Sequence, residues 1–218
     1  MKEYIETIKK APIFKNFSEE NIIKFLGCSK AKVKIYKKNE IIFLAGNLSE
    51  NIGLIIEGVA HVIREDFWGN KTIVGELHEN EIFGEVFAIQ NIPLENTAIA
   101  KTTVKILLIN TDLILNPCQE GYVFHDTILI NLIMILAKKT MAMNRKLEHI
   151  TKRNMKDKIL SYLSRVSEKE KKKTFVIPYN RTELSEFLCV DRAALSKELS
   201  KLQKEGLINY KKNEFTLN

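Results

Sequence analysis

The feature that most constrains the fold of this chain is a long, mainly apolar row between positions 129 and 150. Its members recur at alternating spacings of 4 and 3 residues: Leu129, Ile133, Leu136, Thr140, Met143, Leu147 and Ile150. This heptad spacing predicts a helix over residues 124–150 whose seam pairs with a second copy of the chain. Burial against its own domain is the alternative, because the first half is apolar on more than one face. The two hypotheses are compatible if the first turns pack on the chain's own domain and only the later turns pair with the second copy.

The long helix separates two parts of the chain that differ in charge. Residues 1–137 carry 14 Lys and Arg against 17 Asp and Glu, whereas residues 138–218 carry 20 against 10, a net charge of +10. The C-terminal part therefore predicts a polyanionic partner, with nucleic acid favoured and an anionic membrane surface second. The membrane is less favoured because no amphipathic helix rich in Trp or Phe accompanies the charge.

The chain before the long helix shows a β pattern from residue 33 to residue 110. Short apolar runs of strand length alternate with glycines, which predicts a small barrel or jelly roll. The expected strands are 40–44, 53–56, 59–63, 72–77, 97–100 and 104–109. Residues 66–70 are expected to close a hairpin, and Ser18 to cap a helix that reaches Leu26.

After the long helix, the sequence predicts a helix over 154–166, a charged loop over 168–173 and a strand over 174–178. The expected fold class is α+β. The expected domains are a β-domain at 1–117, a dimerisation helix at 118–150 and a DNA-binding domain at 151–218.

Residues 181–204 predict two short helices joined by a tight turn. Asn180 and Asp191 are the expected N-caps. The expected inner faces carry Leu184, Phe187, Leu188, Leu195, Leu199 and Leu202. Such a helix-turn-helix places its second helix in the major groove of DNA. A β-hairpin is expected over 207–217, with its turn at Lys212 and Asn213, and it would form a wing. The alternative for residues 181–204 is a pair of helices that only packs within the protein and does not bind DNA.

The expected DNA contacts follow from the residue types on the outer face of the second helix. Arg192 can donate two hydrogen bonds to guanine, and the methyl group of Ala193 can meet the methyl group of thymine. Residues at the start of the first helix are placed for phosphates, as is Lys152. The candidate DNA-binding residues are Arg181, Thr182, Arg192, Ala193, Ser196, Lys197 and Lys201.

Taken together, these features resemble the CRP/FNR family of bacterial transcription regulators over nearly the whole chain. Ile82-Phe83-Gly84-Glu85 matches the FGE motif of the cyclic-nucleotide-binding β-roll (jelly roll). The resemblance implies a homodimer that binds a pseudo-palindromic operator in double-stranded DNA, with RNA polymerase as a further partner. Family members often have Glu where this chain has Ala193, so the usual half-site is not expected.

The resemblance places an effector pocket at Gly84, Glu85, Asn96 and Thr97. Members that bind cyclic AMP have an Arg at the position of Asn96, and that Arg pairs with the phosphate. Its absence removes a charge-assisted contact and argues against cyclic AMP. An iron–sulfur cluster is also not expected, because only three cysteines are present and they are widely separated.

The remaining effectors are a small molecule, a gas sensed through haem, or redox chemistry. Short runs such as 65–70 and 187–192 are similar to a branch of the family that responds to nitrosative stress through haem. Cys118 and His125 are the haem-ligand candidates, with His61 and His78 as further imidazoles, although a structural role is commoner for any single histidine. No other metal site is expected.

The rival hypothesis is a cyclic-nucleotide-like regulatory module that acts through protein contacts. An enzyme is not expected, because the chain has no Gly-rich phosphate loop, zinc-ligand spacing or nucleophile motif. A cytoplasmic location is expected, since residues 1–11 lack the apolar run of a signal peptide and the apolar stretch 128–137 is too short to span a bilayer.

Overall fold

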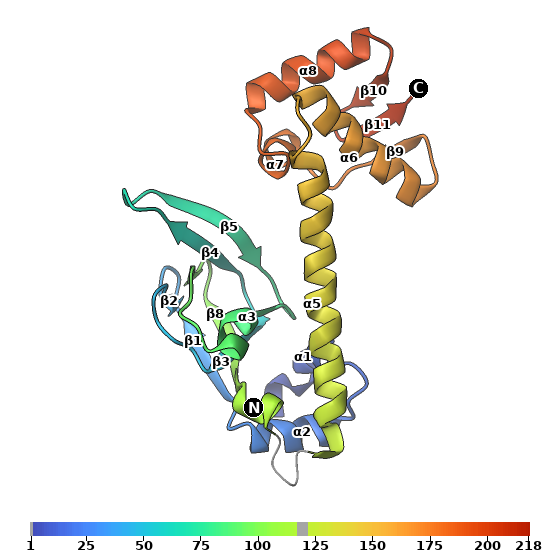
Figure 1. Ribbon diagram of the computed structural model, residues 1–218. Coiled ribbons are helices and arrows are strands. Elements are labelled where there is room, and N and C mark those ends of the chain that lie inside the picture. Colours follow the sequence, from blue (N-terminus) through green and yellow to red (C-terminus); the bar gives the residue numbers. More distant parts are fainter. Residues whose placement is uncertain (1, 117–121) are drawn as a thin grey trace. The chain divides into compact units, whose positions relative to one another are not determined.

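The computed structural model describes residues 2–116 and 122–218. The chain divides into two compact units, Met1–Leu136 and Ala137–Asn218. The boundary falls inside α5 (Tyr122–Ile150), so each unit contains a part of this long helix (Figure 1). The fold class is α+β, as the sequence predicts: a β-roll, a long helix and a winged helix-turn-helix.

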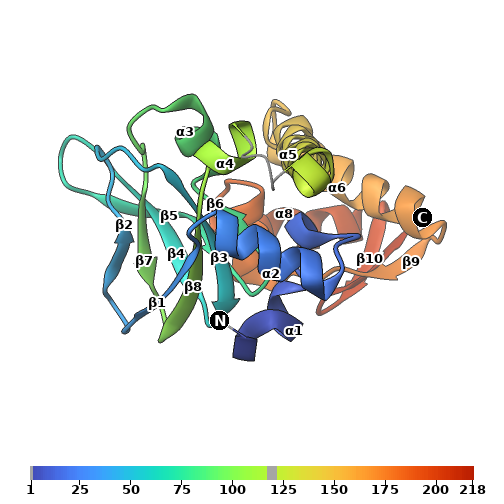
Figure 2. The ribbon, with the colours of Figure 1, turned by 90° about the horizontal axis from the view of Figure 1, so that it is seen from below.

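The N-terminal unit is built on two four-stranded antiparallel sheets that form the β-roll (Figure 2). The strand order of the first sheet is β1 (Lys32–Tyr36), β8 (Val104–Asn110), β3 (Asn51–Glu57) and β6 (Ile82–Phe83). The strand order of the second sheet is β2 (Ile41–Phe43), β7 (Thr97–Ala100), β4 (Ala60–Glu65) and β5 (Lys71–Leu77).

The structure confirms the six predicted strands to within two residues and adds β1 and β6, which the sequence did not predict. β1 has no fully buried residue, and β6 has only two residues. β6 is too short to show an apolar alternation, whereas β1 does alternate, with Val33 and Ile35 each following a lysine, and was readable from the sequence. Both depend on pairing with distant partners, β1 with β8 and β6 with β3.

The helices of this unit are η1 (Lys2–Tyr4), α1 (Ile5–Ile8), η2 (Pro12–Phe14), α2 (Glu19–Cys28), α3 (Glu85–Gln90), α4 (Asp112–Leu115) and the first turns of α5. The predicted cap of α2 is confirmed, because Ser18 Oγ accepts a hydrogen bond from the Asn21 N–H at 3.2 Å. The predicted turn over 66–70 is also confirmed, with the Asp66 carboxylate accepting from the Trp68 and Asn70 N–H groups. Within the described residues, no helix has the length and apolar character needed to cross a membrane.

The larger core of the N-terminal unit lies where α1, α2 and the first half of α5 pack on the first sheet. Phe14, Phe25 and Phe124 meet there with ring centroids 5.6 and 5.8 Å apart. The side chain of Asn131, which is buried on α5, donates hydrogen bonds to the carbonyls of Ile13 at 2.9 Å and Lys15 at 2.8 Å. These bonds satisfy buried polar groups on both sides, so the first half of α5 is fixed to its own unit.

The C-terminal unit combines the end of α5 and three further helices with a three-stranded sheet of order β10-β11-β9. Its elements are the end of α5, α6 (Met155–Glu170), β9 (Thr174–Val176), α7 (Arg181–Phe187), α8 (Arg192–Lys204), β10 (Ile208–Lys211) and β11 (Glu214–Leu217). The charged loop predicted at 168–173 is partly wrong, because α6 continues to Glu170 and ends at Lys171 with a φ of +53°. Lys and Glu are good helix formers, which explains the extension.

Candidate nucleic-acid interface

The two helices of the predicted helix-turn-helix begin at strong caps. Asn180 Oδ1 accepts from the N–H groups of Thr182 at 2.9 Å and Glu183 at 3.0 Å, and the Glu183 carboxylate accepts from the Asn180 N–H at 2.8 Å. Asp191 Oδ1 accepts from the Ala194 N–H at 2.7 Å at the start of α8. Both predicted caps are confirmed, and they fix where each helix starts relative to the turn.

The inner faces of α7 and α8 form one apolar core with α6 and the small sheet. Its helix-turn-helix members are all at most 1% exposed: Leu184, Leu188, Leu195, Leu199 and Leu202. Because an α-helix has 3.6 residues per turn, burial of the three α8 leucines turns the opposite face of α8 away from the unit.

That outward face carries the residues expected to contact DNA. Arg192, Ala193, Lys197 and Lys201 are exposed, and Ser196 is half-buried. An open hollow on α8 is lined by Ser196, Lys197, Ser200, Lys201 and Lys204. Lys204 was not among the predicted site residues, although its position seven residues after Lys197, on the same helix face, was readable from the sequence.

The charges on this face differ in how they are compensated. Among the residues that the structure describes, no acidic side chain pairs with Arg192 or Lys197. Lys201, by contrast, lies 4.0 Å from Glu198 and 3.9 Å from Glu205. The N-terminal half of α8 therefore presents two uncompensated cations to solvent, an arrangement that attracts a polyanion.

Arg181 and Thr182, the two residues at the start of α7 that are expected to contact phosphates, have different surroundings. Thr182 is exposed, but Asn180 already binds its N–H group. The guanidinium of Arg181 lies 4.9 Å from the ring centroid of Tyr210 on β10, and Nη2 donates to the Lys212 carbonyl at 3.2 Å. Burial lowers the pKa of Arg181. Lys152, the further phosphate candidate, is exposed after the end of α5.

The predicted dimerisation seam divides into two parts in the single chain. Leu129 and Leu136 are half-buried against the core of the N-terminal unit. Further along, Met143 is 66% exposed, Leu147 and Thr140 are also exposed, and Ile150 is half-buried. Ile133 interrupts the first part, with 61% of its surface exposed. The alternative of burial on its own domain thus describes the first turns only.

Two of the four predicted effector-pocket residues, Gly84 and Thr97, lie near Phe43 of β2. Gly84 has a φ of +78°, and a Cβ there would lie 2.7 Å from the Phe43 ring. Phe43 also pairs with Ala98 of β7, next to Thr97, whose Oγ1 accepts from the Ala45 N–H at 3.1 Å. Glu85 is only 3% exposed, and Asn96 is half-buried. Gly84 therefore has a packing reason that is independent of any ligand.

Of the two main haem-ligand candidates, the structure describes only His125. Cys118 lies outside the described residues. His125 Nε2 is 3.0 Å from the Ile114 carbonyl, and Nδ1 is 3.5 Å from the Asp126 carboxylate, so both ring nitrogens have neighbours. In the described part of the chain, no group of three or more His, Cys, Asp and Glu has the geometry to hold a metal ion.

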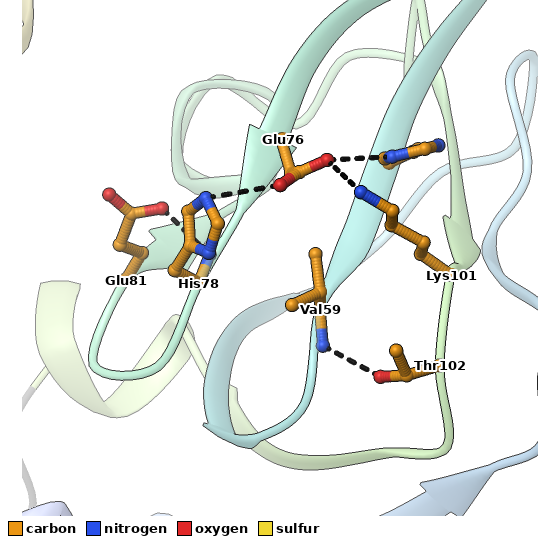
Figure 3. Close-up of polar contacts among 7 residues, drawn as sticks. Val59, Glu76, His78, Glu81, Lys101 and Thr102 are labelled. Carbon is orange, nitrogen blue, oxygen red and sulfur yellow. Dashed lines mark hydrogen bonds and ion pairs between the residues drawn. The ribbon is translucent and has the colours of Figure 1, made fainter. Parts of the chain in front are cut away.

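His61 and His78 instead share the carboxylate of Glu76 on the second sheet. Figure 3 shows this carboxylate between His78 and Lys101. Glu76 Oε2 lies 2.8 Å from His61 Nε2 and 2.6 Å from Lys101 Nζ, and Oε1 lies 3.4 Å from His78 Nε2. Hydrogen bonds from Lys101 and His61 hold the pKa of the Glu76 carboxyl below its usual value. This network joins β4, β5 and the turn after β7, which gives both imidazoles a structural role.

The geometry of the C-terminal unit defines a class of protein: a DNA-binding protein with a winged helix-turn-helix. Two family models match the chain, "Cyclic nucleotide-binding domain" over residues 33–120 and "Crp-like helix-turn-helix domain" over residues 157–218. Together these matches take in well over half of the chain. The chain belongs to the CRP/FNR family of transcription regulators.

Solved structures show the same fold. The c-di-GMP-responsive global regulator CLP of Xanthomonas campestris is 19% identical with a TM-score of 0.59, and the match covers 92% of this chain and 99% of that one. The catabolite activator protein of Thermus thermophilus is 17% identical with a TM-score of 0.50, with coverages of 95% and 94%. A cyclic nucleotide-binding domain from Methylobacillus flagellatus is 18% identical with a TM-score of 0.56, with coverages of 71% and 85%. No curated protein matches the sequence.

The C-terminal turn of α5 is joined to the helix-turn-helix by a buried histidine. His149 is 2% exposed, and its Nδ1 lies 2.8 Å from Ser161 Oγ of α6. Its ring meets Tyr162 edge-on at 5.8 Å and Phe187 of α7 at 6.3 Å. Burial lowers the pKa of His149, because the charged imidazolium is poorly solvated there.

We expect the C-terminal unit to lose stability as the pH falls below about 6.5, the ordinary histidine pKa. The unfolded chain takes up a proton near that pH, whereas the folded His149 does so only at lower pH, so protonation favours unfolding. Hydrogen–deuterium exchange of α6 and α8 peptides at pH values from about 7.5 to about 5.5 measures this. His149→Gln should remove the pH dependence, and His78→Gln, on the exposed network, should leave it. An unchanged dependence in His149→Gln contradicts the assignment.

Proposed function

We propose that this protein is a homodimeric, sequence-specific DNA-binding regulator whose β-roll senses an effector other than cyclic AMP and repositions two recognition helices. The observation that carries the proposal is the outward face of α8, where capped helices and a leucine core present Arg192 and Lys197 without ionic partners in the described chain. The functional division is the one expected from the sequence, with sensing at 1–117, dimerisation at 118–150 and DNA binding at 151–218.

Base recognition is assigned to the first two turns of α8. Arg192 and Lys197 are the donors that suit guanine, and Ala193 offers only a methyl group. A carboxylate in place of Ala193 would accept from cytosine, so this chain's half-site differs at that base pair. Two such helices in a symmetric dimer enter successive major grooves about 34 Å apart and bind a pseudo-palindromic operator. Lys201, held near two carboxylates, is assigned to the phosphate backbone.

Arg192→Ala is expected to weaken binding to an operator obtained by duplex selection by about 10- to 100-fold, the worth of one bidentate base contact. Binding to random duplex should change little. Lys201→Ala is the matched control, since loss of a phosphate contact weakens both duplexes alike and reduces the salt dependence. Fluorescence anisotropy at several salt concentrations gives these values. Equal losses on both duplexes for Arg192→Ala would remove its base-reading role.

The dimer proposal is supported by the second half of α5. Met143 and Leu147 expose apolar surface on one side of a helix, at the spacing that a coiled-coil seam requires. In water such a row is stabilised by a partner, and a second copy of the same row is self-complementary about a two-fold axis. Met141 is similarly exposed, at 54%, but lies outside the seam because two residues rotate the helix surface by about 200°.

Met143→Glu is expected to dissociate the dimer, since it places two carboxylates opposite each other in a desolvated seam, and an increase in dimer Kd of at least about tenfold should follow. Met141→Glu introduces the same charge outside the seam and should leave the dimer intact. Sedimentation equilibrium measures both variants. If the two variants behave alike, or if neither dissociates, the α5 seam is not the interface.

The effector is assigned to the β-roll, near Glu85 and Asn96. An arginine partner for a cyclic nucleotide phosphate is missing at Asn96, and the adjacent Glu95 would repel that phosphate. The Xanthomonas campestris regulator responds to c-di-GMP, so a CRP-like fold accepts effectors other than cyclic AMP. Haem, a gas bound through it, a small molecule and redox chemistry are the candidates. For haem, Cys118 and His125 are the proposed ligands, and His125 would first have to leave the Ile114 carbonyl.

Cyclic AMP at about 1 mM is expected to change neither the melting temperature nor the operator affinity. The arginine partner for its phosphate is missing at Asn96, and a ligand stabilises a protein only if it binds the folded state. Thermal melts and anisotropy titrations measure this. A rise of several degrees would overturn the prediction. Protein from anaerobic cells titrated with haem tests the main alternative. A Soret band in the unmodified protein that is lost in His125→Ala would identify haem as the effector cofactor. If the unmodified protein shows no Soret band, a small molecule and redox chemistry are the remaining candidates.

Regulation is expected to take place in the cytoplasm, with RNA polymerase as the partner that converts operator binding into altered transcription. A module that acts only through protein contacts has less support, because the C-terminal unit matches the Crp-like helix-turn-helix domain. That alternative predicts no salt-dependent duplex binding, so the anisotropy titration also separates the two functions.

A further inference from the structure

Arg181 is the first residue of α7, and its side chain packs against the wing, the hairpin of β10 and β11. Its guanidinium is 4.9 Å from the ring centroid of Tyr210 on β10 and 5.6 Å from that of Phe215 on β11. The two rings are a cross-strand pair, stacked with their centroids 5.6 Å apart. Arg181 therefore meets both strands of the wing at once through the faces of two aromatic rings, a favourable place for a planar cation.

Arg181 also holds the tip of the wing. Nη2 donates to the carbonyl of Lys212, which occupies the turn between β10 and β11 with a φ of +57°. Asn213, the other residue of that turn, is bonded to Ile177 beyond β9 through both its side chain and its backbone carbonyl. The tip is thus fixed from two sides, and Arg181 supplies the side that faces the helix-turn-helix.

The base of the wing is joined to α8 by separate bonds. Gln203 Nε2 donates to Asn209 Oδ1 at 2.7 Å, and the hydroxyls of Ser200 and Tyr210 lie 3.4 Å apart. These contacts involve the start and middle of β10. Within the described residues, only the contact from Arg181 reaches from the start of α7 to the turn at Lys212, which directly follows the exposed Lys211.

We propose that Arg181 is a positioning residue that sets the wing tip, and with it Lys211 and Lys212, against the DNA backbone beside the groove occupied by α8. This inference rests on the proposed DNA-binding function and refines it. Arg181 was expected to bind a phosphate directly. Its guanidinium, engaged by two rings and a carbonyl, acts on DNA through the wing lysines.

The chemistry of Arg181 separates positioning from direct contact. A phosphate contact needs only a positive charge, which lysine supplies. Stacking across two rings with a hydrogen bond to a carbonyl needs a planar guanidinium, which lysine does not supply. Arg181→Lys should therefore lose operator affinity nearly as much as Arg181→Met, by about 5- to 10-fold. Arg165→Met, the same change at an arginine of α6 that pairs with Glu148, is the matched control and should bind within about twofold of the unmodified protein.

The decisive measurement is the effect of Arg181→Met in a Lys211→Ala/Lys212→Ala background of the full chain. Loss of the two lysines should lower the salt dependence of binding by the equivalent of about two phosphate contacts. In that background, Arg181→Met should cause little further loss of operator affinity, because both changes act through the wing tip and their effects are therefore not additive. If Arg181→Lys binds like the unmodified protein, and Arg181→Met weakens binding equally in both backgrounds, Arg181 contacts phosphate directly and the inference is wrong.

A second readout does not depend on DNA. Hydrogen–deuterium exchange of the β10–β11 peptides should be faster in Arg181→Lys and Arg181→Met than in the unmodified protein, with exchange in α8 unchanged. If the unmodified protein binds no duplex, the proposed function fails, and this exchange result still decides whether Arg181 holds the wing. Unchanged exchange in the wing overturns the inference.

Discussion

The apolar contact between α7 and α8 is the constraint on which the DNA-binding surface depends. Five leucines meet there with α6 and the small sheet, and their burial decides which side of α8 faces solvent. The buried apolar area favours this arrangement whatever the outward residues are. Arg192 and Lys197 need no structural role of their own, and so the outward face is open to functional variation, such as Ala193 in place of an acidic residue.

α5 serves two environments because its two halves meet different neighbours. Asn131 is bonded to the N-terminal segment and fixes the early turns, whereas Met143 and Leu147 have apolar surface left in solvent. Its last turn is fixed again, through His149, to α6 and α7. A change in the pairing of the exposed stretch would therefore act on a helix whose end is packed against the helix-turn-helix, the coupling that the proposed function requires.

In the β-roll, the Phe-Gly-Glu motif alone is weak evidence for an effector-binding site. The Phe-Gly-Glu motif is present, yet Gly84 is required by the approach of Phe43, and Thr97 is bonded to the backbone next to β2. The two imidazoles near the sheet are bound to Glu76. The motif thus identifies the fold of the domain, and the arginine that is missing at Asn96 argues only against cyclic AMP as the effector of the proposed function.

The sequence by itself determined the features that depend on neighbours within about four residues. The caps at Asn180 and Asp191, the turn after β4 and the periods of α8 and β7 follow from such local interactions, and the structure confirms them. Tertiary structure alone decided the partners of Arg181, which lie some thirty residues further along the chain, and the two-residue strand β6, which forms only by pairing with β3. Local periodicity carries no information about such contacts, because which distant side chains meet is set by how the elements pack.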